Sequence, residues 1–532
     1  MKKFVLGFLS CLLVFAFSAC TTSTPATEPS GGSVNKTGLP IVDEKITLRG
    51  MVALDPNVPD WNTHPFCIEL EKRTNIHVEW ECVPEDAWFE RRNLAFASNE
   101  LPDFILRAVL SPEDEVKYAS TGQIIAIDPL FSDYAPSFSA IMAQEPSVLR
   151  NIVLPDGHVY ALPQLNKVEG NLIDKYWINK TWLDNLGLSV PETVDEFYNA
   201  LVAFRDNDPN GNGLKDEIPF SINVSNPRSL IQHFYGAWGF GHNHGILNRP
   251  SYIDVDDNGK IRVIAADPRF KEMLTFFNRL WSENLLDHEV FSQSRPQLVA
   301  KIETDQIGFS NSGFNNQWMG AKRDNYVAMP ALKGPYDSRG HWHMTNPLVQ
   351  NNGIFVITSA NQHPEATMRW IDYFYSLEGT RLVRMGIEGE SYDVIDGKNV
   401  IKDEILNSPD GLDVALSKWA VYSGGLIPQM IVDEVDGSAA QLPEIKAITE
   451  MMRPFLLPYD VFPRPKYTEE ESRRLGAIAT DLQTYMDESV TKFITGELSL
   501  DKFDDFVQQL QKMNMDEYIA IHQAAFDRWK NY

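Results

Sequence analysis

The first twenty residues, MKKFVLGFLSCLLVFAFSAC, restrict this chain more than any other stretch, because they decide the compartment in which it folds. Lys2 and Lys3 precede a largely apolar run from Phe4 to Phe17, and small residues precede Cys20. A charged start, a short apolar segment and small residues before the cleavage point are typical of a secretion signal, and the run is too short to span a bilayer permanently. The sequence therefore predicts export.

Cys20 is the expected point of membrane attachment. It directly follows Ser18 and Ala19 and precedes a Thr-, Ser-, Pro- and Gly-rich stretch, which is the arrangement of a lipid-modified cysteine on a flexible tether. An ordinary cleaved signal and a membrane helix are the alternatives. We expect a signal peptide at residues 1–19 and a lipid-anchored tether at residues 20–43, so that the protein works at the outer (or periplasmic) face of the cytoplasmic membrane.

The composition of the mature chain excludes some partners. The full chain has a net charge of −26, and loss of the two signal lysines makes the mature protein more acidic still. An acidic surface of this kind repels nucleic acid and anionic lipid. The ordered length exceeds what one core usually supports, so at least two domains are expected. No second stretch approaches membrane-spanning length, which leaves the lipid as the only expected hold on the membrane.

Two cysteines remain after the signal and the acylated Cys20 are set aside. Cys67 is expected near the start of a helix at about residues 62–73, and Cys82 near the end of the following strand. A helix that runs antiparallel to its strand brings these ends together, so a disulfide between Cys67 and Cys82 is one possibility in an exported protein. Two buried free thiols are the other.

Short apolar runs alternate with amphipathic helices from Glu44 onward, which indicates βαβ units and a parallel sheet. Thr193 and Glu196 have the spacing of a capping box at a helix start, and the chain from Ile445 to the end is expected to be nearly all helix. The strands expected along the chain are 46–52, 77–83, 103–107, 158–162, 175–179, 303–310, 326–330 and 353–358.

Several motifs occur in an order that resembles one protein family. They are Leu101-Pro-Asp103-Phe, Tyr176-Trp-Ile-Asn-Lys-Thr-Trp-Leu183, Val190-Pro-Glu-Thr-Val-Asp-Glu-Phe197, Asp208-Pro-Asn-Gly-Asn-Gly-Leu-Lys-Asp-Glu217, Asn352-Gly-Ile-Phe-Val-Ile-Thr358, Pro364-Glu-Ala366 and Gly386-Ile-Glu-Gly389. Their order and spacing resemble the large extracellular solute-binding lipoproteins of carbohydrate ABC importers, the group that includes alginate-oligosaccharide-binding proteins and lipoproteins of the LplA type. The resemblance covers essentially the whole mature chain.

The resemblance implies an α/β fold of two lobes, each a doubly wound sheet, that close on a sugar. We expect an N-lobe at residues 44–165 plus about 345–415, and a C-lobe with a helical C-terminal region at residues 166–344 plus about 416–532. It also implies a monomer that delivers an oligosaccharide to the permease subunits of an ABC transporter. Ligands of open α/β sheets lie beyond the carboxyl ends of the strands, so the residues that follow the strands deserve inspection.

Residues 206–217 are expected to bind calcium, because oxygen donors stand at every second position and glycines permit the tight turns. One register begins at Asp206 and places Glu217 at position 12, as in an EF-hand. The preferred register begins at Asp208, as in the family that the chain resembles, and a metal-free Asn/Gly turn is the alternative. In the preferred register a structural Ca²⁺ is held by Asp208, Asn210, Asn212, the Leu214 carbonyl, Asp216 and Glu217.

Sugar sites combine flat aromatic rings with hydrogen-bonding groups. Trp318 follows the 303–310 strand, at the position where related proteins place a stacking tryptophan, and it is the first candidate. For each tryptophan the alternative is ordinary packing in the core or at its rim. The remaining candidates are Trp61, Trp238, Trp342, Arg107, and Glu388 in the Gly386–Gly389 motif.

Solute binding competes with two other functions. A surface-anchored glycoside hydrolase or lyase would need a pair of carboxylates at a defined separation, which the many acids of the chain do not exclude. No Gly-x-Ser-x-Gly, His-Glu-x-x-His, phosphate loop or dinucleotide fingerprint is present. A binding protein for a peptide or another solute is the third possibility. We expect a binding protein without enzymatic activity.

Overall fold

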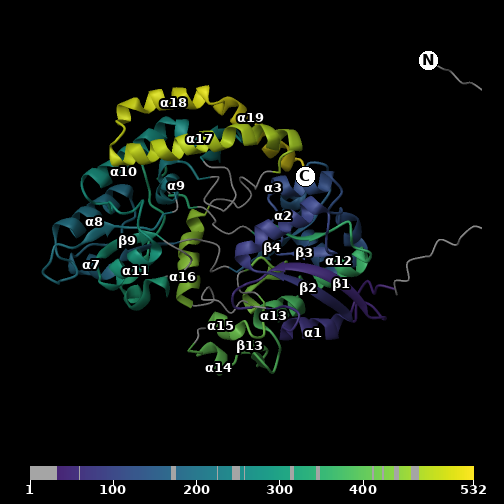
Figure 1. The fold of residues 1–532 in the computed structure, drawn as a ribbon. Helices are drawn as coiled ribbons and strands as arrows, with labels where there is room; N and C mark the ends of the chain where they lie inside the picture. The colour runs from purple at the N-terminus through teal and green to yellow at the C-terminus, as the bar shows by residue number, and fades with distance from the viewer. Residues whose placement is uncertain are drawn as a thin grey trace, which may run out of the picture.

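The computed structural model describes residues 33–532 except 59, 169–174, 225, 242–251, 257, 312–316, 339, 343–347, 410–411, 422–424, 436–442 and 457–465. It has two lobes, each with its own sheet, and a layer of C-terminal helices that extends over both (Figure 1). This is the two-lobed α/β architecture that the sequence predicts.

The N-lobe is built on a six-stranded sheet with the order β14-β4-β11-β3-β1-β2. Its strands are β1 (Ile46–Ala53), β2 (Ile76–Val83), β3 (Phe104–Leu106), β4 (Ala161–Asn166), β11 (Val349–Ile357) and β14 (Gln429–Ile431). Its helices are α1 (Pro65–Thr74), α2 (Trp88–Ser98), α3 (Pro112–Ser120), α4 (Phe131–Tyr134), α5 (Pro136–Gln144), α6 (Ser147–Ile152), α12 (Pro364–Tyr373) and α13 (Leu377–Met385).

Helices cover both faces of this sheet. Leu48 and Val52 of β1 pack into one core together with α1 and α12, whereas Met51 and Ala53 pack into a second core together with α2. Alternate residues of a strand point to opposite faces, so the consecutive buried apolar residues Met51, Val52 and Ala53 need cover on both sides of the sheet. The N-lobe is therefore doubly wound, as predicted.

The C-lobe has a four-stranded sheet with the order β10-β5-β9-β6. Its strands are β5 (Tyr176–Asn179), β6 (Ile218–Phe220), β9 (Ile307–Asn311) and β10 (Tyr326–Ala328), with a hairpin of β7 (Ile253–Val255) and β8 (Ile261–Val263) beside them. Its helices are α7 (Lys180–Asn185), α8 (Val194–Asp206), α9 (Pro227–Ile231), α10 (Pro268–Ser282), α11 (Arg295–Glu303) and the 3₁₀ segment η6 (Gln317–Asn325). The predicted capping box of Thr193 and Glu196 is present at the start of α8.

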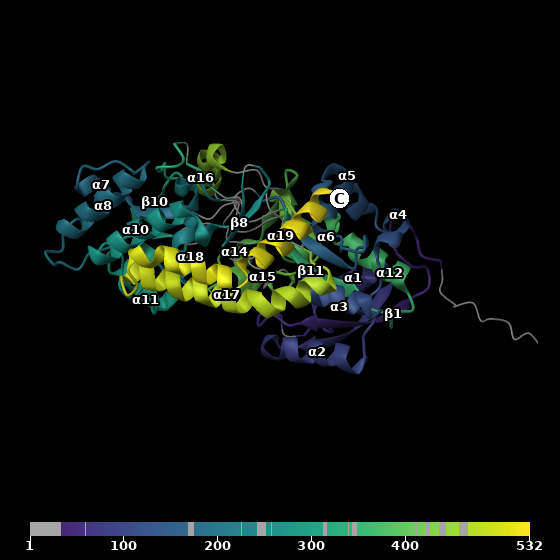
Figure 2. The ribbon, with the colours of Figure 1, turned by 90° about the horizontal axis from the view of Figure 1, so that it is seen from above.

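The C-terminal helices join the lobes. They are α16 (Pro443–Met452), α17 (Glu469–Thr495), α18 (Phe503–Lys512) and α19 (Met515–Lys530). Figures 1 and 2 show α17, α18 and α19 in yellow, running from the C-lobe across to the N-lobe. Helix α17 contacts α10 of the C-lobe and α3 of the N-lobe, and α19 contacts α6. Among the described residues, no helix combines the length and apolar content that crossing a membrane requires.

Two of the expected boundaries differ from the structure. Strand β14 pairs with β4 of the N-lobe, so the chain does not return to the C-lobe at about residue 416. A small module beside the N-lobe precedes it, made of β12 (Tyr392–Ile395), β13 (Lys398–Ile401), α14 (Asp403–Leu406) and α15 (Leu412–Leu416). The strand expected at 303–310 starts only at Ile307, because α11 continues to Glu303.

The tether is shorter than expected. Val34 bridges Val42, and Ile41 and Val42 are 0% and 1% exposed within the N-lobe core. Arg369 of α12 also donates hydrogen bonds to the carbonyls of Lys36 and Gly38. Apolar side chains at the end of the predicted tether thus attach residues 34–42 to the N-lobe, while Cys20 and the signal peptide lie outside the described residues.

Candidate functional site

A row of polar side chains lies along the edge of the N-lobe sheet at which the parallel strands β1, β2 and β3 end. Strand β11 is antiparallel to β3, so its first residues meet the same edge, and the last residues of β4 and β14 do so as well. Polar groups here are positioned for a ligand, because solutes of open α/β sheets bind beyond the carboxyl ends of strands. In the order of the sheet the row contains Gln429, Gln164, Asn166, Gln350, Asn351, Arg107, Asp55 and Glu85.

Amide side chains form one half of this row. Nε2 of Gln164 and Nδ2 of Asn166 both donate to Oε1 of Gln350, each at 3.3 Å, and Nδ2 of Asn351 donates to Oε1 of Gln164 at 3.2 Å. Gln429 is fully buried, and neither its Nε2 nor its Oε1 has a hydrogen-bond partner among the described residues. Buried amide atoms without partners are costly, and a hydroxyl-bearing ligand would satisfy them.

Arg107 lies in the charged half of the row. Its backbone has a φ of 55°, and its guanidinium donates to the Val421 carbonyl at 2.9 Å and to the Ala53 carbonyl at 3.4 Å. Burial lowers the pKa of Arg107 to about 10, although the charges of Asp55 and Glu85 act in the opposite direction. The predicted residue therefore stands at the expected edge, but protein carbonyls and carboxylates already surround its charge.

Two cavities open beside the row. One, of about 540 Å³, lies beyond β1 and β2 and is lined by Leu54, Asp55, Pro56, Pro84, Glu85 and Asp86. The other, of about 650 Å³, lies between the N-lobe edge and the C-terminal helices, and includes Asn351 in its lining. Both volumes fall within the range of small-molecule sites in proteins. Asn351 therefore connects the amide cluster with the larger cavity.

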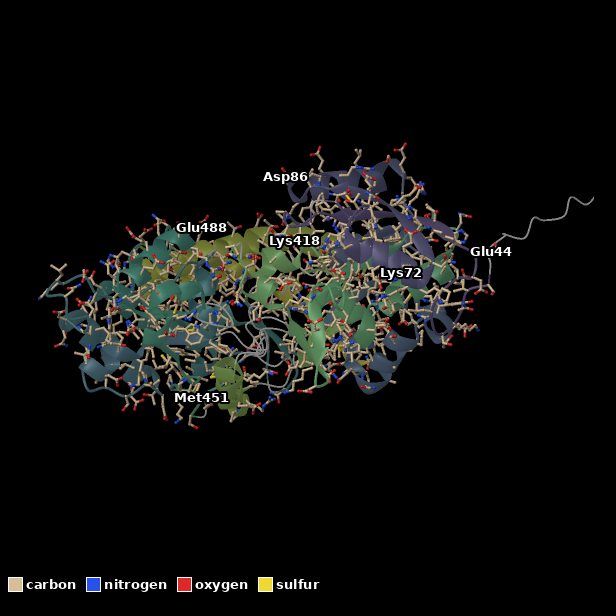
Figure 3. The ribbon with its side chains drawn as sticks, turned by 90° about the horizontal axis from the view of Figure 1, so that it is seen from below. Glu44, Lys72, Asp86, Lys418, Met451 and Glu488 are labelled. Atoms are coloured by element: carbon tan, nitrogen blue, oxygen red, sulfur yellow. The ribbon has the colours of Figure 1, made fainter. Side chains whose placement is uncertain are left out.

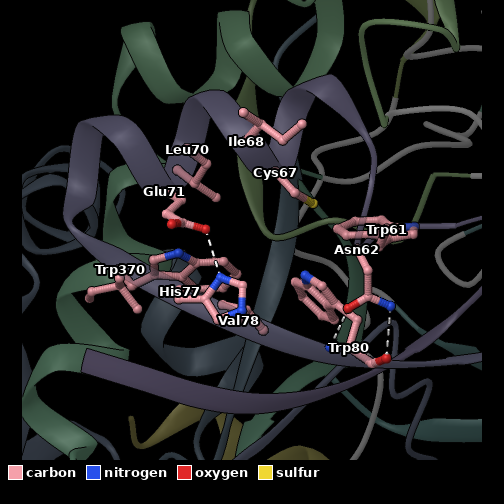
Figure 4. Close-up of a pocket in the computed structure, with 11 residues that line it drawn as sticks. Trp61, Asn62, Cys67, Ile68, Leu70, Glu71, His77, Val78, Trp80 and Trp370 are labelled. Carbon is pink, nitrogen blue, oxygen red and sulfur yellow. Dashed lines mark hydrogen bonds and ion pairs between the residues drawn. The ribbon is translucent and has the colours of Figure 1, made fainter. Parts of the chain in front are cut away.

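Trp61 is not part of either cavity. Its side chain is fully buried in the N-lobe core, with ring centroids 4.9 Å from Trp80 and 6.0 Å from Phe66. Figure 4 shows Trp61 beside Cys67 and Asn62 around a space of about 30 Å³, which is far too small for a sugar ring. The structure therefore does not support stacking of Trp61 on a sugar, because its side chain is fully buried against two other rings.

Two of the other predicted tryptophans are also core residues. Trp238 is 3% exposed beside Phe276, and Trp342 is 2% exposed and packs edge-to-face on Tyr176 at 4.5 Å. Glu388 is exposed beside Tyr392 and lines neither of the two large cavities. Trp318 lies in η6, which follows the C-lobe strand β9, and its side chain lies outside the described residues.

Sequence reasoning missed the amide cluster. The signal that was present is the polarity of Gln164 and Asn166 in an otherwise apolar strand, together with Gln350, Asn351 and Asn352 at the start of another. A strand buried on both faces is normally a continuous apolar run, so amide side chains in such a strand indicate a possible binding site. Gln429 carried no such signal, because β14 has only three residues.

The loop between α8 and β6 is a tight turn that contains the residues of the preferred calcium register. The Asp208 carboxylate accepts from the backbone N–H groups of Asn212 and Gly213, and Nδ2 of Asn212 donates to Oδ1 of Asp216 at 3.0 Å. Gly211 and Gly213 have φ values of 71° and 78°, which glycine adopts without strain. These contacts bring Asp208, Asn212 and Asp216 together around the centre of the loop.

One carboxylate oxygen of this loop, in the Glu217 side chain, lacks a hydrogen-bond partner among the described residues. Its Oε1 is buried and has no hydrogen-bond partner, and burial together with the charges of Asp216 and Asp208 raises the pKa of Glu217. A cation is the natural partner for such a carboxylate. In the described part of the chain, no three His, Cys, Asp or Glu side chains lie close enough together to hold a metal ion by themselves. The loop supplies Asn and backbone oxygens beside its three carboxylates, so its donor set still fits calcium.

Cys67 and Cys82 are free thiols in this structure. The Cys82 thiol donates to Oδ1 of Asp60 at 3.8 Å and accepts from the Trp61 backbone N–H at 3.5 Å. Burial raises the pKa of the Cys67 thiol well above its ordinary value, and the charge of Cys82 acts in the same direction. Both cysteines are half-buried in the N-lobe and are not bonded to each other in this structure, so the choice between a disulfide and two free thiols stays a prediction.

Known proteins resemble this chain in sequence and in fold. FusA, the fructooligosaccharide ABC transporter substrate-binding protein of Streptococcus pneumoniae, is 29% identical over 506 residues, which cover 92% of this chain and 91% of FusA. The structure of FusA in complex with kestose matches with a TM-score of 0.73 and 28% identity, covering 91% of this chain and 100% of the FusA chain. FusA has also been solved as an EF-hand mutant in complex with fructo-nystose, with a TM-score of 0.73 and 26% identity, covering 91% of this chain and 100% of that one.

Other matches extend the comparison. Lipoprotein LipO of Bacillus subtilis is 25% identical over 389 residues, covering 69% of this chain and 72% of LipO. A solute-binding protein from Bifidobacterium longum infantis shares the fold with a TM-score of 0.78 at 22% identity, covering 92% of this chain and 99% of that one. The sequence profile of the family described as bacterial extracellular solute-binding protein matches residues 52–381, more than half of the chain. The chain therefore belongs to the bacterial extracellular solute-binding proteins.

Proposed function

We propose that this protein captures an oligosaccharide between its two lobes and delivers it to the permease subunits of an ABC transporter. The observation that carries the proposal is the polar row at the carboxyl edge of the N-lobe sheet, with the buried and unpartnered amide of Gln429 at its end. Family membership and the likeness to FusA, a fructooligosaccharide-binding protein, support the same function.

Binding would work through closure of the lobes. A ligand stabilises a closed state only through contacts that exist when both lobes touch it, so affinity and closure should change together. Gln164 and Asn351 would contribute hydrogen bonds from the N-lobe, and Trp318 would contribute a stacking ring from the C-lobe. The permease would then recognise the closed form of a monomeric binding protein, which itself makes no covalent change in the sugar.

The experiment is a calorimetric titration of the mature protein with a panel of neutral and acidic oligosaccharides, followed by small-angle scattering with and without the sugar that binds. We expect binding with a dissociation constant in the micromolar range or tighter, a smaller radius of gyration in the complex, and no consumption of the sugar. Turnover of a sugar by the purified protein would instead favour a glycoside hydrolase or lyase. Binding of peptides and no sugars would favour a peptide carrier.

Calcium would hold the loop of residues 208–217 in place. Its ligands would be Asp208, Asn210, Asn212, the Leu214 carbonyl, Asp216 and Glu217, as in the register that begins at Asp208. The unpartnered Oε1 of Glu217 and the solved EF-hand mutant of FusA support this site. The ion would supply a fixed positive charge to a carboxylate-rich turn, and its role would be structural because protein oxygens fill the shell.

Cys20 would carry the lipid that holds the protein at the outer face of the cytoplasmic membrane, as the name of the relative LipO also favours. Cys20→Ser in the producing cell should release the protein from the membrane fraction without lowering its melting temperature. Retention of the variant in the membrane fraction, with signal cleavage intact, would contradict the anchor.

A further inference from the structure

The larger cavity is bounded by parts of the chain that belong to different lobes. The N-lobe contributes the loop after β3, the start of β11 and Leu426, while α17 and α19 contribute one face each. The α17 residues have helical spacing, which puts them on one side of that helix. They are Ser472, Leu475, Gly476, Ala479 and Gln483. We refer to this space of about 650 Å³ as the α17 cavity.

Within the part of the chain that the structure describes, four of the side chains that line the α17 cavity have a polar atom without a hydrogen-bond partner. Two belong to residues that are 1% and 2% exposed, Glu115 and His522 respectively. Unsatisfied buried polar atoms are rare in folded proteins, so four around one cavity indicate a missing partner. The atoms are Oε1 of Glu115, Oδ1 of Asn352, Oγ of Ser472 and Nε2 of His522.

These atoms include both acceptors and a donor. Burial lowers the pKa of His522 to about 3, so the imidazole is neutral near pH 7. Its Nδ1 shares a hydrogen bond of 2.6 Å with the Tyr467 hydroxyl, so the unpartnered Nε2 is a donor or an acceptor according to the tautomer. The Ser472 hydroxyl is a donor as well as an acceptor. Glu115 and Asn352 offer acceptor oxygens. Hydroxyl groups both donate and accept, so a hydroxyl-rich ligand satisfies this mixture, and the apolar side chains of Phe89, Leu475 and Ala479 suit the apolar face of a sugar ring.

The charges around the cavities oppose an acidic ligand. The described residues that line the α17 cavity and the 540 Å³ cavity include five carboxylates and no Lys or Arg side chain. Nζ of Lys466 lies 2.8 Å from Glu115, and Arg107 lies among backbone carbonyls near Asp55 and Glu85. The surface as a whole does not offset these negative charges, because acidic residues outnumber basic ones by 73 to 47. Figure 3 shows side chains of both signs on the surface, with Asp86 and Lys72 on the N-lobe and Glu488 on α17.

We propose that the α17 cavity is a subsite that holds an uncharged, hydroxyl-rich unit of the oligosaccharide, and that the carboxylates around it reject sugars bearing uronic or sialic acid. This inference rests on the proposed function and specifies its solute class. A ligand carboxylate inside such a site would lie near Glu115 and Glu113. Lys466 is already paired with Glu115, and the described residues that line the cavity include no basic side chain that could balance the added charge. Like charges a few ångströms apart near a protein surface repel.

Gly476 provides a direct test of occupancy. A Cβ atom added to Gly476 would meet no atom within 4 Å, so a larger side chain there can extend into open space at the cavity. Glycine is a poor residue inside a helix, so Gly476→Phe should not weaken α17. Ala477→Phe is the matched control, because Ala477 is exposed on the same helix and does not line the cavity.

The experiment titrates the mature protein and its variants by calorimetry with three neutral trisaccharides (kestose, maltotriose and raffinose) and with trigalacturonate, an acidic trisaccharide. We expect at least one neutral sugar to bind wild type, and trigalacturonate to bind at least about a hundredfold more weakly. Gly476→Phe should weaken the neutral sugar at least about tenfold, and Ala477→Phe should not. Ser472→Ala, which removes one unpartnered hydroxyl, should weaken binding about threefold or more while the melting temperature stays equal or rises.

The outcomes separate this inference from the proposed function. Trigalacturonate binding that equals or exceeds that of the neutral sugars overturns the inference and leaves the oligosaccharide-binding function intact. Unchanged affinity of both Gly476→Phe and Ser472→Ala for the neutral sugar also overturns it. Absence of binding by every sugar overturns the inference and the proposed function together.

Discussion

Lys466 and Glu115 form a buried ion pair that joins the segment before α17 to α3 of the N-lobe. Nζ of Lys466 lies 2.8 Å from Oε2 of Glu115, and the two side chains are 7% and 2% exposed. Burial raises the pKa of Glu115, and the charge of Lys466 acts against that shift. Because each charge needs the other inside the protein, this pair fixes the C-terminal helices against the N-lobe.

Lys466→Met should therefore lower the free energy of unfolding by about 3–5 kcal/mol at pH 7, because it leaves the Glu115 carboxylate buried without a partner. Urea unfolding followed by circular dichroism measures the loss. The double variant Lys466→Met/Glu115→Leu should recover most of it, since neither charge is then buried. A single variant as stable as wild type would show that the pair does not connect the helices to the N-lobe.

Removal of calcium should lower the melting temperature of the wild-type protein, and added calcium should restore it, because an ion bound only to the folded state stabilises that state by mass action. Asp208→Ala together with Asp216→Ala should abolish the response to chelator in differential scanning calorimetry. Asp256→Ala is a matched control, because Asp256 also caps backbone N–H groups in a turn, those of Asn258 and Lys260. Identical melting of wild type with and without chelator would rule out the calcium site.

Trp61→Ala should lower the stability of the fold, whereas Trp318→Ala should lower the affinity for sugar. Trp61 is fully buried beside Trp80 and Phe66, so its truncation should cost about 3–5 kcal/mol of folding free energy. Loss of a stacking ring at Trp318 should leave the melting temperature unchanged and reduce sugar affinity by about 1–3 kcal/mol, roughly tenfold or more. Calorimetric titration and thermal melting of both variants give the comparison. Normal sugar affinity of Trp318→Ala would place the stacking ring elsewhere.

Acid should destabilise the fold through His522. Its ordinary pKa of 6.5 falls to about 3 because burial penalises the imidazolium. The unfolded chain thus binds a proton that the folded chain does not, so the contribution of neutral His522 is complete above pH 6.5 and is lost as the pH falls toward 3. By pH 5 the loss is about 2 kcal/mol. The drop in stability from pH 7.5 to pH 5 should therefore be smaller in His522→Gln than in wild type, and equal drops would contradict this account.

The local patterns of the sequence predicted much of the fold. The strand β1, the helix start at Thr193 and the crossing strand at Tyr176 all follow from residues that are close in the chain. The turn at residues 208–217 belongs to the same class, because its polar side chains and glycines lie within ten residues, and its calcium site remains a proposal. Periodicity, capping and turn chemistry act over a few residues, and one sequence is enough to see them.

The candidate site required the tertiary structure. Trp61 and Trp342 are of the residue type that often stacks on sugars, but they pack against Trp80 and Tyr176 and are therefore core residues. Gln164, Asn351 and Gln429 are spread over more than 260 residues of the chain and meet only because β14, β4 and β11 are neighbours in the sheet. Which aromatic ring stays exposed and which amides meet at one edge depend on packing between distant segments, and that long-range packing, unlike a helix cap or a metal loop, leaves no pattern in any single stretch of sequence.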